Sequence, residues 1–261
     1  MLKGLAIILL ALTPISAAAA DFSVTNTKLG MTDAEIISAL PDDLRPTAER
    51  RLLGALGESP IPYVRVSAGT AECEALRFKE HGRVCTRYSA FLMSKGSTFH
   101  SISITLDQFF ETSIDISVIE NLLIKNFGEP SAKIMNPIYN FNIEKSSISR
   151  VGAPSKWPDG MQVEIPPFSP LPLFIWTPEI SNIDPSKRNS LLSVAPNVGQ
   201  IGLTQPLLRV FVNLDGNRVS GLKIILSDPV AHNEWSARLE QAERAKRLER
   251  ERAAEGQIRL R

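Results

Sequence analysis

Three carboxylates fall at regular spacing in the middle of the chain. Asp107, Glu111 and Asp115 follow an alternating segment and precede a helical pattern. Two carboxylates that flank a substrate can act as general acid and as base or nucleophile in hydrolysis. Carboxylates at a helix entrance also interact favourably with the helix dipole. The three residues therefore allow a hydrolytic site or a helix start, and we favour the helix start.

Two cysteines, Cys73 and Cys85, are the only ones in the chain. In an oxidising compartment, a pair this close in sequence favours a disulfide over a metal site. A dithiol redox centre normally has a much shorter spacing at a helix start. A bridge that closes a loop of about 13 residues contributes on the order of 3 kcal/mol. We therefore predict a structural disulfide between these residues.

Other chemistries find little support in the residue pattern. The histidines His81, His100 and His232 are far apart in sequence, whereas a zinc site needs three or four converging ligands. The glycines are too scattered for a phosphate-binding loop. The formal net charge of +1 gives no global attraction for nucleic acid. We expect no metal, no cofactor and no nucleic-acid partner.

Residues 1–20 are typical of a secretory signal peptide. Lys3 precedes a short apolar core, and small residues lead to a cleavage site near Ala20. The apolar core is too short for a stable membrane anchor, and no later segment is apolar for long enough to span a bilayer. We therefore expect a periplasmic or secreted protein.

Two helices are predicted from their start and stop signals. Thr32 and Glu35 are spaced for a capping box, and so are Ser117 and Glu120 after an alternating strand at residues 99–106. Gly128 is placed to end the second helix. Three leucines at helical spacing also suggest a short helix within residues 48–56.

Several further segments alternate in the manner of strands. Residues 63–67 and 83–93 are two candidates, and a turn at residues 95–97 leads into the strand at 99–106. The clearest hairpin joins residues 207–213 to 218–226 around Asp215 and Gly216. Ser220 and Gly221 mark a bulge in its second strand. These elements predict an α+β fold of antiparallel sheet with two short capped helices packed on it.

A proline-rich insertion interrupts the predicted globular region, which spans residues 21–230 as one unit or as two units at 21–97 and 98–230. Ten of the eighteen prolines lie within residues 150–206. A short edge strand is predicted at residues 171–176. An exposed sheet edge can bind a partner by strand addition, so Leu171, Phe174 and Trp176 are candidate partner-binding residues.

A charged tail at residues 231–261 has helical spacing. Glu240 with Arg244, Glu243 with Arg247, and Arg247 with Glu251 are spaced for ion pairs along one helix. A narrow apolar seam consists of Trp235, Leu239, Ala242, Ala245 and Leu248. The pattern fits a solvated helix or a contact surface, in which Trp235 and Leu239 bind a partner or residues 235–248 bind a second copy.

Three short stretches resemble the SmpA/OmlA family of small bacterial envelope proteins. These are the helix opening at residues 29–36, the helix ending at residues 127–130, and the closing hairpin at residues 211–225. The resemblance implies helix-plus-antiparallel-sheet units in tandem, an architecture also used by β-lactamase inhibitor proteins. It also implies a class of non-catalytic envelope proteins that act through surface contacts. We therefore expect a binding or adaptor protein of a bacterial envelope, with a periplasmic hydrolase as the alternative.

Overall fold

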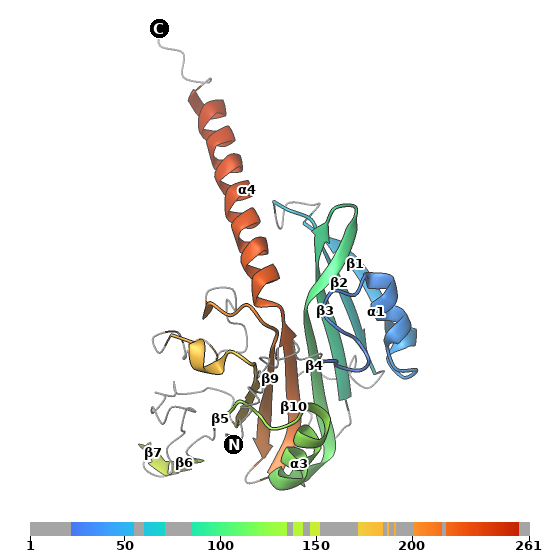
Figure 1. Ribbon diagram of the computed structural model, residues 1–261, viewed down its shortest axis with the longest axis vertical. Coiled ribbons are helices and arrows are strands. Elements are labelled where there is room, and N and C mark those ends of the chain that lie inside the picture. Colours follow the sequence, from blue (N-terminus) through green and yellow to red (C-terminus); the bar gives the residue numbers. More distant parts are fainter. Residues whose placement is uncertain are drawn as a thin grey trace, which may run out of the picture.

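The computed structural model forms an antiparallel sheet from which one long helix projects (Figure 1). The described residues are 22–54, 60–70, 85–134, 138–142, 147–151, 172–184, 187, 191, 201–215 and 218–255. The predicted signal peptide therefore lies outside the described residues, as do Cys73, His81 and Leu171.

The sheet has eight strands in the order β1-β2-β3-β4-β10-β9-β8-β5, and every neighbouring pair is antiparallel. This confirms the predicted α+β class. A separate two-stranded ribbon pairs β6 (Ile138–Asn142) with β7 (Ser147–Val151). The strands of the main sheet are β1 (Glu49–Leu53), β2 (Tyr63–Gly69), β3 (Cys85–Lys95), β4 (Thr98–Asp115), β5 (Ala132–Ile134), β8 (Leu173–Trp176), β9 (Leu207–Asp215) and β10 (Arg218–Ser227).

Three α-helices belong to the described part of the chain, namely α1 (Asp33–Ala39), α3 (Ile116–Phe127) and α4 (Pro229–Glu255). Two short 3-10 helices are η1 (Arg45–Thr47) and η2 (Ile180–Asn182). The predicted helix at residues 48–56 is wrong, because η1 leads directly into strand β1. The charged tail is helical to Glu255, as predicted.

The helix starts are only partly as predicted. Thr32 and Glu35 form the expected capping box at α1. The N-cap of α3 is Asp115, whose carboxylate accepts a hydrogen bond of 2.8 Å from the Ser117 backbone N–H. The predicted capping box of Ser117 and Glu120 is therefore wrong. Strand β4 continues nine residues beyond the predicted Leu106, because β3 pairs with it as far as Phe109 and β10 as far as Asp115.

The core has two parts, one on each face of the sheet. Helices α1 and α3 cover one face with Ile36, Leu40, Ile119 and Leu123, all of which are buried against the same cluster. On the opposite face, the β5, β8 and β9 end packs against four buried residues, Ile183, Leu191, Ile201 and Leu203. The sheet crosses both proposed units, since β4 joins β3 from the first to β10 from the second.

Two predicted turn features agree with the structure. Gly96 links β3 to β4 with a φ of 66°, a conformation that glycine adopts without steric cost. The ladder of β10 shifts register between Val219 and Gly221 against both neighbours, which confirms the predicted bulge. Gly96 thus closes the β3–β4 hairpin near the base of α4, whereas the bulge lies at the opposite end of β10.

Candidate functional site

Helix α4 begins directly after β10 and projects away from the sheet (Figure 1). The Asp228 backbone N–H donates to the Ile102 carbonyl at 2.9 Å. The Asp228 carboxylate accepts from the Ala231 backbone N–H at 3.0 Å. Pro229 is the first helical residue, a position where its missing N–H costs no helical hydrogen bond. The helix start is therefore fixed to the end of β10.

Three aromatic rings hold the first turns of α4 against the sheet, and we call them the aromatic anchor. The Trp235 ring lies 5.6 Å from the Tyr63 ring and 5.2 Å from the Phe91 ring between centroids, edge to face in both cases. Tyr63 and Phe91 lie 4.9 Å apart on neighbouring strands. The Arg238 guanidinium donates to the Ser94 carbonyl at 2.9 Å one helical turn later. The base of α4 is thereby joined to β2 and β3.

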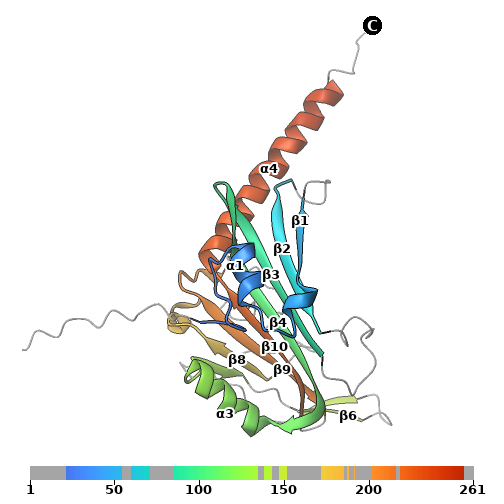
Figure 2. The ribbon, with the colours of Figure 1, turned by 90° about the vertical axis from the view of Figure 1, so that its right-hand side faces the viewer.

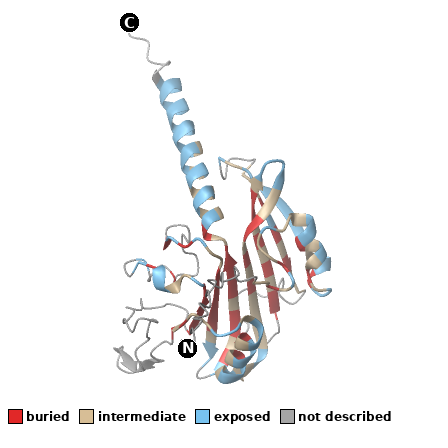
Figure 3. Cartoon of the chain, viewed as in Figure 1, coloured by how far each residue is buried: buried red, intermediate tan, exposed pale blue. Residues whose placement is uncertain are grey.

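Beyond the anchor, α4 extends away from the sheet, and its surface is exposed (Figure 3). Leu239 and Ala242 are partly buried, whereas every residue from 243 to 254 is exposed. Leu248 is 51% exposed. Two of the predicted ion pairs form, Glu240–Arg244 at 3.6 Å and Arg247–Glu251 at 3.9 Å. We call residues 243–254 the distal segment of α4.

The apolar seam predicted along the tail is divided by this arrangement. Trp235 packs on the chain's own sheet through the aromatic anchor, while Ala245 and Leu248 face solvent. The distal segment therefore contains no large aromatic side chain. Its exposed side chains include the apolar Leu248 and the mixed charges around it.

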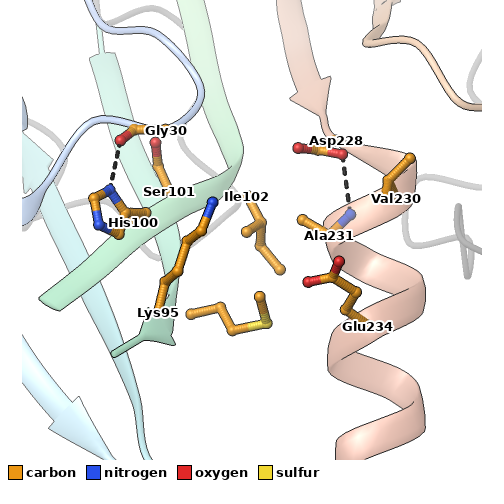
Figure 4. Close-up of a pocket in the computed structure, with 10 residues that line it drawn as sticks. Gly30, Lys95, His100, Ser101, Ile102, Asp228, Val230, Ala231 and Glu234 are labelled. Atoms are coloured by element: carbon orange, nitrogen blue, oxygen red, sulfur yellow. Dashed lines mark hydrogen bonds between the residues drawn. The ribbon is translucent and has the colours of Figure 1, made fainter. Parts of the chain in front are cut away.

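A cleft of about 600 Å³ opens between the β3–β4 hairpin and the first two turns of α4 (Figure 4). Lys95 and His100 lie on the strand side, and Asp228 and Glu234 lie on the helix side. Apolar side chains of the lining are Met93, Ile102 and Val230. The volume is in the range of small-molecule sites.

His100 and Ser101, two polar residues of the cleft, are already engaged in holding the fold. His100 has Nδ1 2.8 Å from the Gly30 carbonyl oxygen and Nε2 2.8 Å from the Thr98 hydroxyl. The Ser101 hydroxyl donates to the Lys28 carbonyl at 2.9 Å. Because both groups have these partners, the lining offers no serine and histidine aligned as nucleophile and base.

The predicted carboxylate cluster does not converge. Asp107 forms a half-buried ion pair of 3.0 Å with Lys223 on β10. Glu111 is exposed on the same strand, and residues four apart on a strand are separated by about 13 Å. Hydrogen bonds from Ser117 lower the pKa of Asp115, which caps α3. The helix-start interpretation is confirmed for Asp115, and the spacing does not support a shared hydrolytic site.

The predicted edge strand lies inside the sheet, so that prediction is wrong. Strand β8 pairs with β9 on one side and with β5 on the other. Phe174 and Trp176 are 1% and 3% exposed, and the Trp176 indole N–H donates to the Gly128 carbonyl at 2.9 Å. These two side chains stabilise the core below α3 and are not available to a partner.

The remaining predicted site residues have structural surroundings. Cys85 is buried at the start of β3, and its bridge to Cys73 stays a prediction. His232 is half-buried on α4, and burial lowers its pKa, although Asp228 acts in the opposite direction. No group of three or more metal-ligating side chains gathers within the residues that the structure describes.

Sequence reasoning missed the residues that line the cleft. Lys95 and Glu234 are far apart in the chain and carry no motif, so only the pairing of β4 with β10 brings their elements together. No family model, curated protein or solved structure matches this chain. Within the described ranges, no helix has the length and apolar character needed to cross a membrane.

Proposed function

We propose that this chain is a non-catalytic binding or adaptor protein of a bacterial envelope, and that it contacts a protein partner through the distal segment of α4. The observation that carries the proposal is the difference between the two ends of α4. Its base is fixed to the sheet by the aromatic anchor and Arg238, and its distal segment is exposed throughout. A rigidly held, exposed helix can present a preorganised surface.

The signal-like residues 1–20 support an envelope location, with cleavage near Ala20 and a periplasmic or secreted mature chain. The short resemblances to SmpA/OmlA-like proteins favour the same class. A hydrolase that uses Asp107, Glu111 and Asp115 receives no support from the geometry, because Asp107 is paired with Lys223 and Asp115 caps α3. The contact proposal therefore leads.

The test is affinity capture from crosslinked envelopes with the mature protein and with a form truncated after Gln241. This truncation removes the distal segment and keeps Trp235, Arg238 and Leu239, so the anchored base stays intact. We expect a specific partner with the full chain and its loss with the truncated form. Equal capture by both forms would place the contact elsewhere. Capture by neither form would count against the adaptor function itself.

A matched pair of point variants separates a contact at Leu248 from the general effect of adding a negative charge to the surface. Leu248→Glu and Val118→Glu each replace an exposed apolar residue, 51% and 55% exposed, with an acid. Leu248 lies on the distal segment of α4 and Val118 lies on α3. We expect only Leu248→Glu to weaken capture. Equal weakening by both variants would contradict a contact at the distal segment.

A further inference from the structure

The sheet has one covered edge and one exposed edge. Strand β5 forms the covered edge, where Ala132 and Ile134 are 5% and 0% exposed. Strand β1 forms the other edge and lies at the outside of the sheet (Figure 2). Residues 49–52 are exposed, and within the described part of the chain only β2 pairs with β1. Backbone N–H and C=O groups of an edge strand can pair with an additional strand.

Arginines on both faces of β1 give this edge a distinct charge. Arg51 lies directly opposite Arg65 of β2, so the two guanidinium groups share one face of the sheet. Glu49 is the carboxylate that pairs with Arg51, at 2.6 Å. On the other face, Arg50 reaches Asp33 of α1. At this edge, the guanidinium groups of Arg50, Arg51 and Arg65 accompany the carboxylates of Glu49 and Asp33. A guanidinium has enough donors to bind a further carboxylate.

The same charges disfavour a second copy of the chain in the registers that set the arginines of β1 against each other. In an antiparallel pairing that aligns all five residues of β1, Arg51 would lie against Arg51 of the second copy. A shift of one residue toward Glu49 would oppose Arg50 with Arg51. Like charges directly opposite each other destabilise a strand pair. In an added acidic strand, by contrast, each carboxylate lies opposite a guanidinium, and opposite charges stabilise a strand pair.

We propose that the outer edge of β1 binds an extended acidic segment of a partner protein as an added strand. Acidic residues of the segment face Arg50 and Arg51, and apolar residues face Leu52 and Leu53. Leu52 is 49% exposed and offers the apolar part of the contact. Backbone hydrogen bonds supply affinity in this mode, and the side chains supply selectivity. The inference does not rest on the α4 proposal, since the two surfaces share no residue.

The test uses the mature full chain and a fluorescein-labelled peptide, Ser-Thr-Val-Val-Glu-Glu-Thr-Thr, read by fluorescence anisotropy. A second peptide carries Lys in place of both Glu residues. We expect the lysine peptide to bind about tenfold more weakly, since two attractive charge pairs become repulsive. Binding of the acidic peptide should also weaken as salt is added. Equal binding of the two peptides would overturn the proposal.

A charge reversal in the protein gives the complementary measurement. Arg51→Glu should reverse the preference, so that the lysine peptide binds more tightly than the acidic one. Lys125→Glu on α3 makes the same change of charge at an exposed position away from β1 and should keep the original preference. A preference that persists in Arg51→Glu, or reverses in both variants, would show that the peptide does not lie along β1.

Backbone pairing is separated from simple charge attraction by methylating the peptide. One version carries N-methyl groups on the third, fifth and seventh residues, and the other carries them on the fourth and sixth. Because an added strand uses the N–H groups of alternate residues, one version should lose binding while the other retains it. Equal effects of the two patterns would overturn strand addition. A dimer in sedimentation that Arg51→Glu dissociates would instead identify a second copy as the occupant and overturn the acidic-segment proposal.

Discussion

Replacing Trp235 with alanine should release the base of α4 from the sheet. The substitution removes two edge-to-face ring contacts, at 5.6 Å to Tyr63 and 5.2 Å to Phe91. Each such pair contributes about 0.5 to 1.5 kcal/mol beyond burial. The half-buried indole also covers on the order of 100 Å² of apolar surface, which corresponds to about 2.5 kcal/mol. The two contributions add to about 3.5 to 5.5 kcal/mol, and because alanine keeps part of the contact area we expect the docking of α4 to weaken by slightly less, about 3 kcal/mol.

Hydrogen exchange measures this effect directly. A helix without tertiary contacts is only marginally stable in water, so the amides of residues 231–239 should exchange faster once the anchor is lost. A loss of about 3 kcal/mol corresponds to roughly a hundredfold faster exchange if these amides open by undocking. Amides in the centre of β3 and β10 should change much less, because their ladders remain paired on both sides.

Leu248→Ala is the matched control for this measurement. Leu248 lies on the same helix but is 51% exposed, and surface substitutions of this kind usually change stability by less than about 0.5 kcal/mol. If residues 231–239 exchange at the same rate in Trp235→Ala and Leu248→Ala, the aromatic anchor does not hold α4. The rigid presentation of the distal segment would then lose its physical basis.

Three further outcomes are expected. Burial raises the pKa of Tyr88 to about 12 from 10.0; its contribution to the free energy of unfolding should be complete below pH 10 and fall by about 2 kcal/mol toward pH 12. Urea unfolding of Tyr88→Phe should lack this decrease, and parallel curves for the two proteins would contradict it. Gly221→Ala would place a Cβ 2.6 Å from the Gln108 carbonyl oxygen, so unfolding should become easier by about 1 to 3 kcal/mol, as measured by the urea midpoint. Mass spectrometry without reductant should find Cys73 linked to Cys85, and free thiols at both would refute the disulfide.

Local features could be predicted from sequence because they depend on neighbours in the chain. The capping box of Thr32 and Glu35 needs only four consecutive residues. The hairpin of β9 and β10 and its bulge near Gly221 follow from alternation and turn chemistry. Gly128 ends α3 with a φ of 77°, and its backbone N–H donates to the Ile124 carbonyl. In each case the partners lie within one turn or one hairpin.

The start of α3 shows how tertiary pairing changed a local prediction. Ser117 and Glu120 have the spacing of a capping box, yet Asp115 takes the N-cap position. Strand β4 remains paired with β10 up to Asp115, opposite Arg218. The chain leaves the sheet at Asp115, and the carboxylate of this residue accepts a hydrogen bond from the Ser117 backbone N–H. The position of the α3 N-cap is therefore set by the point where the pairing of β4 with β10 ends.

The sequence by itself indicated the α+β class, two short helices packed on antiparallel sheet, and a charged helical tail, because hydrophobic period and capping residues act over a few positions. Only the tertiary structure decided which strands are edges. Residues of β8 and β1 reveal no strand order in their own pattern, yet β8 is enclosed by β9 and β5, while β1 keeps one side open within the described residues. Strand order results from packing between distant segments, and that packing assigned Phe174 and Trp176 to the core and left Arg50, Arg51 and the distal segment of α4 at the surface.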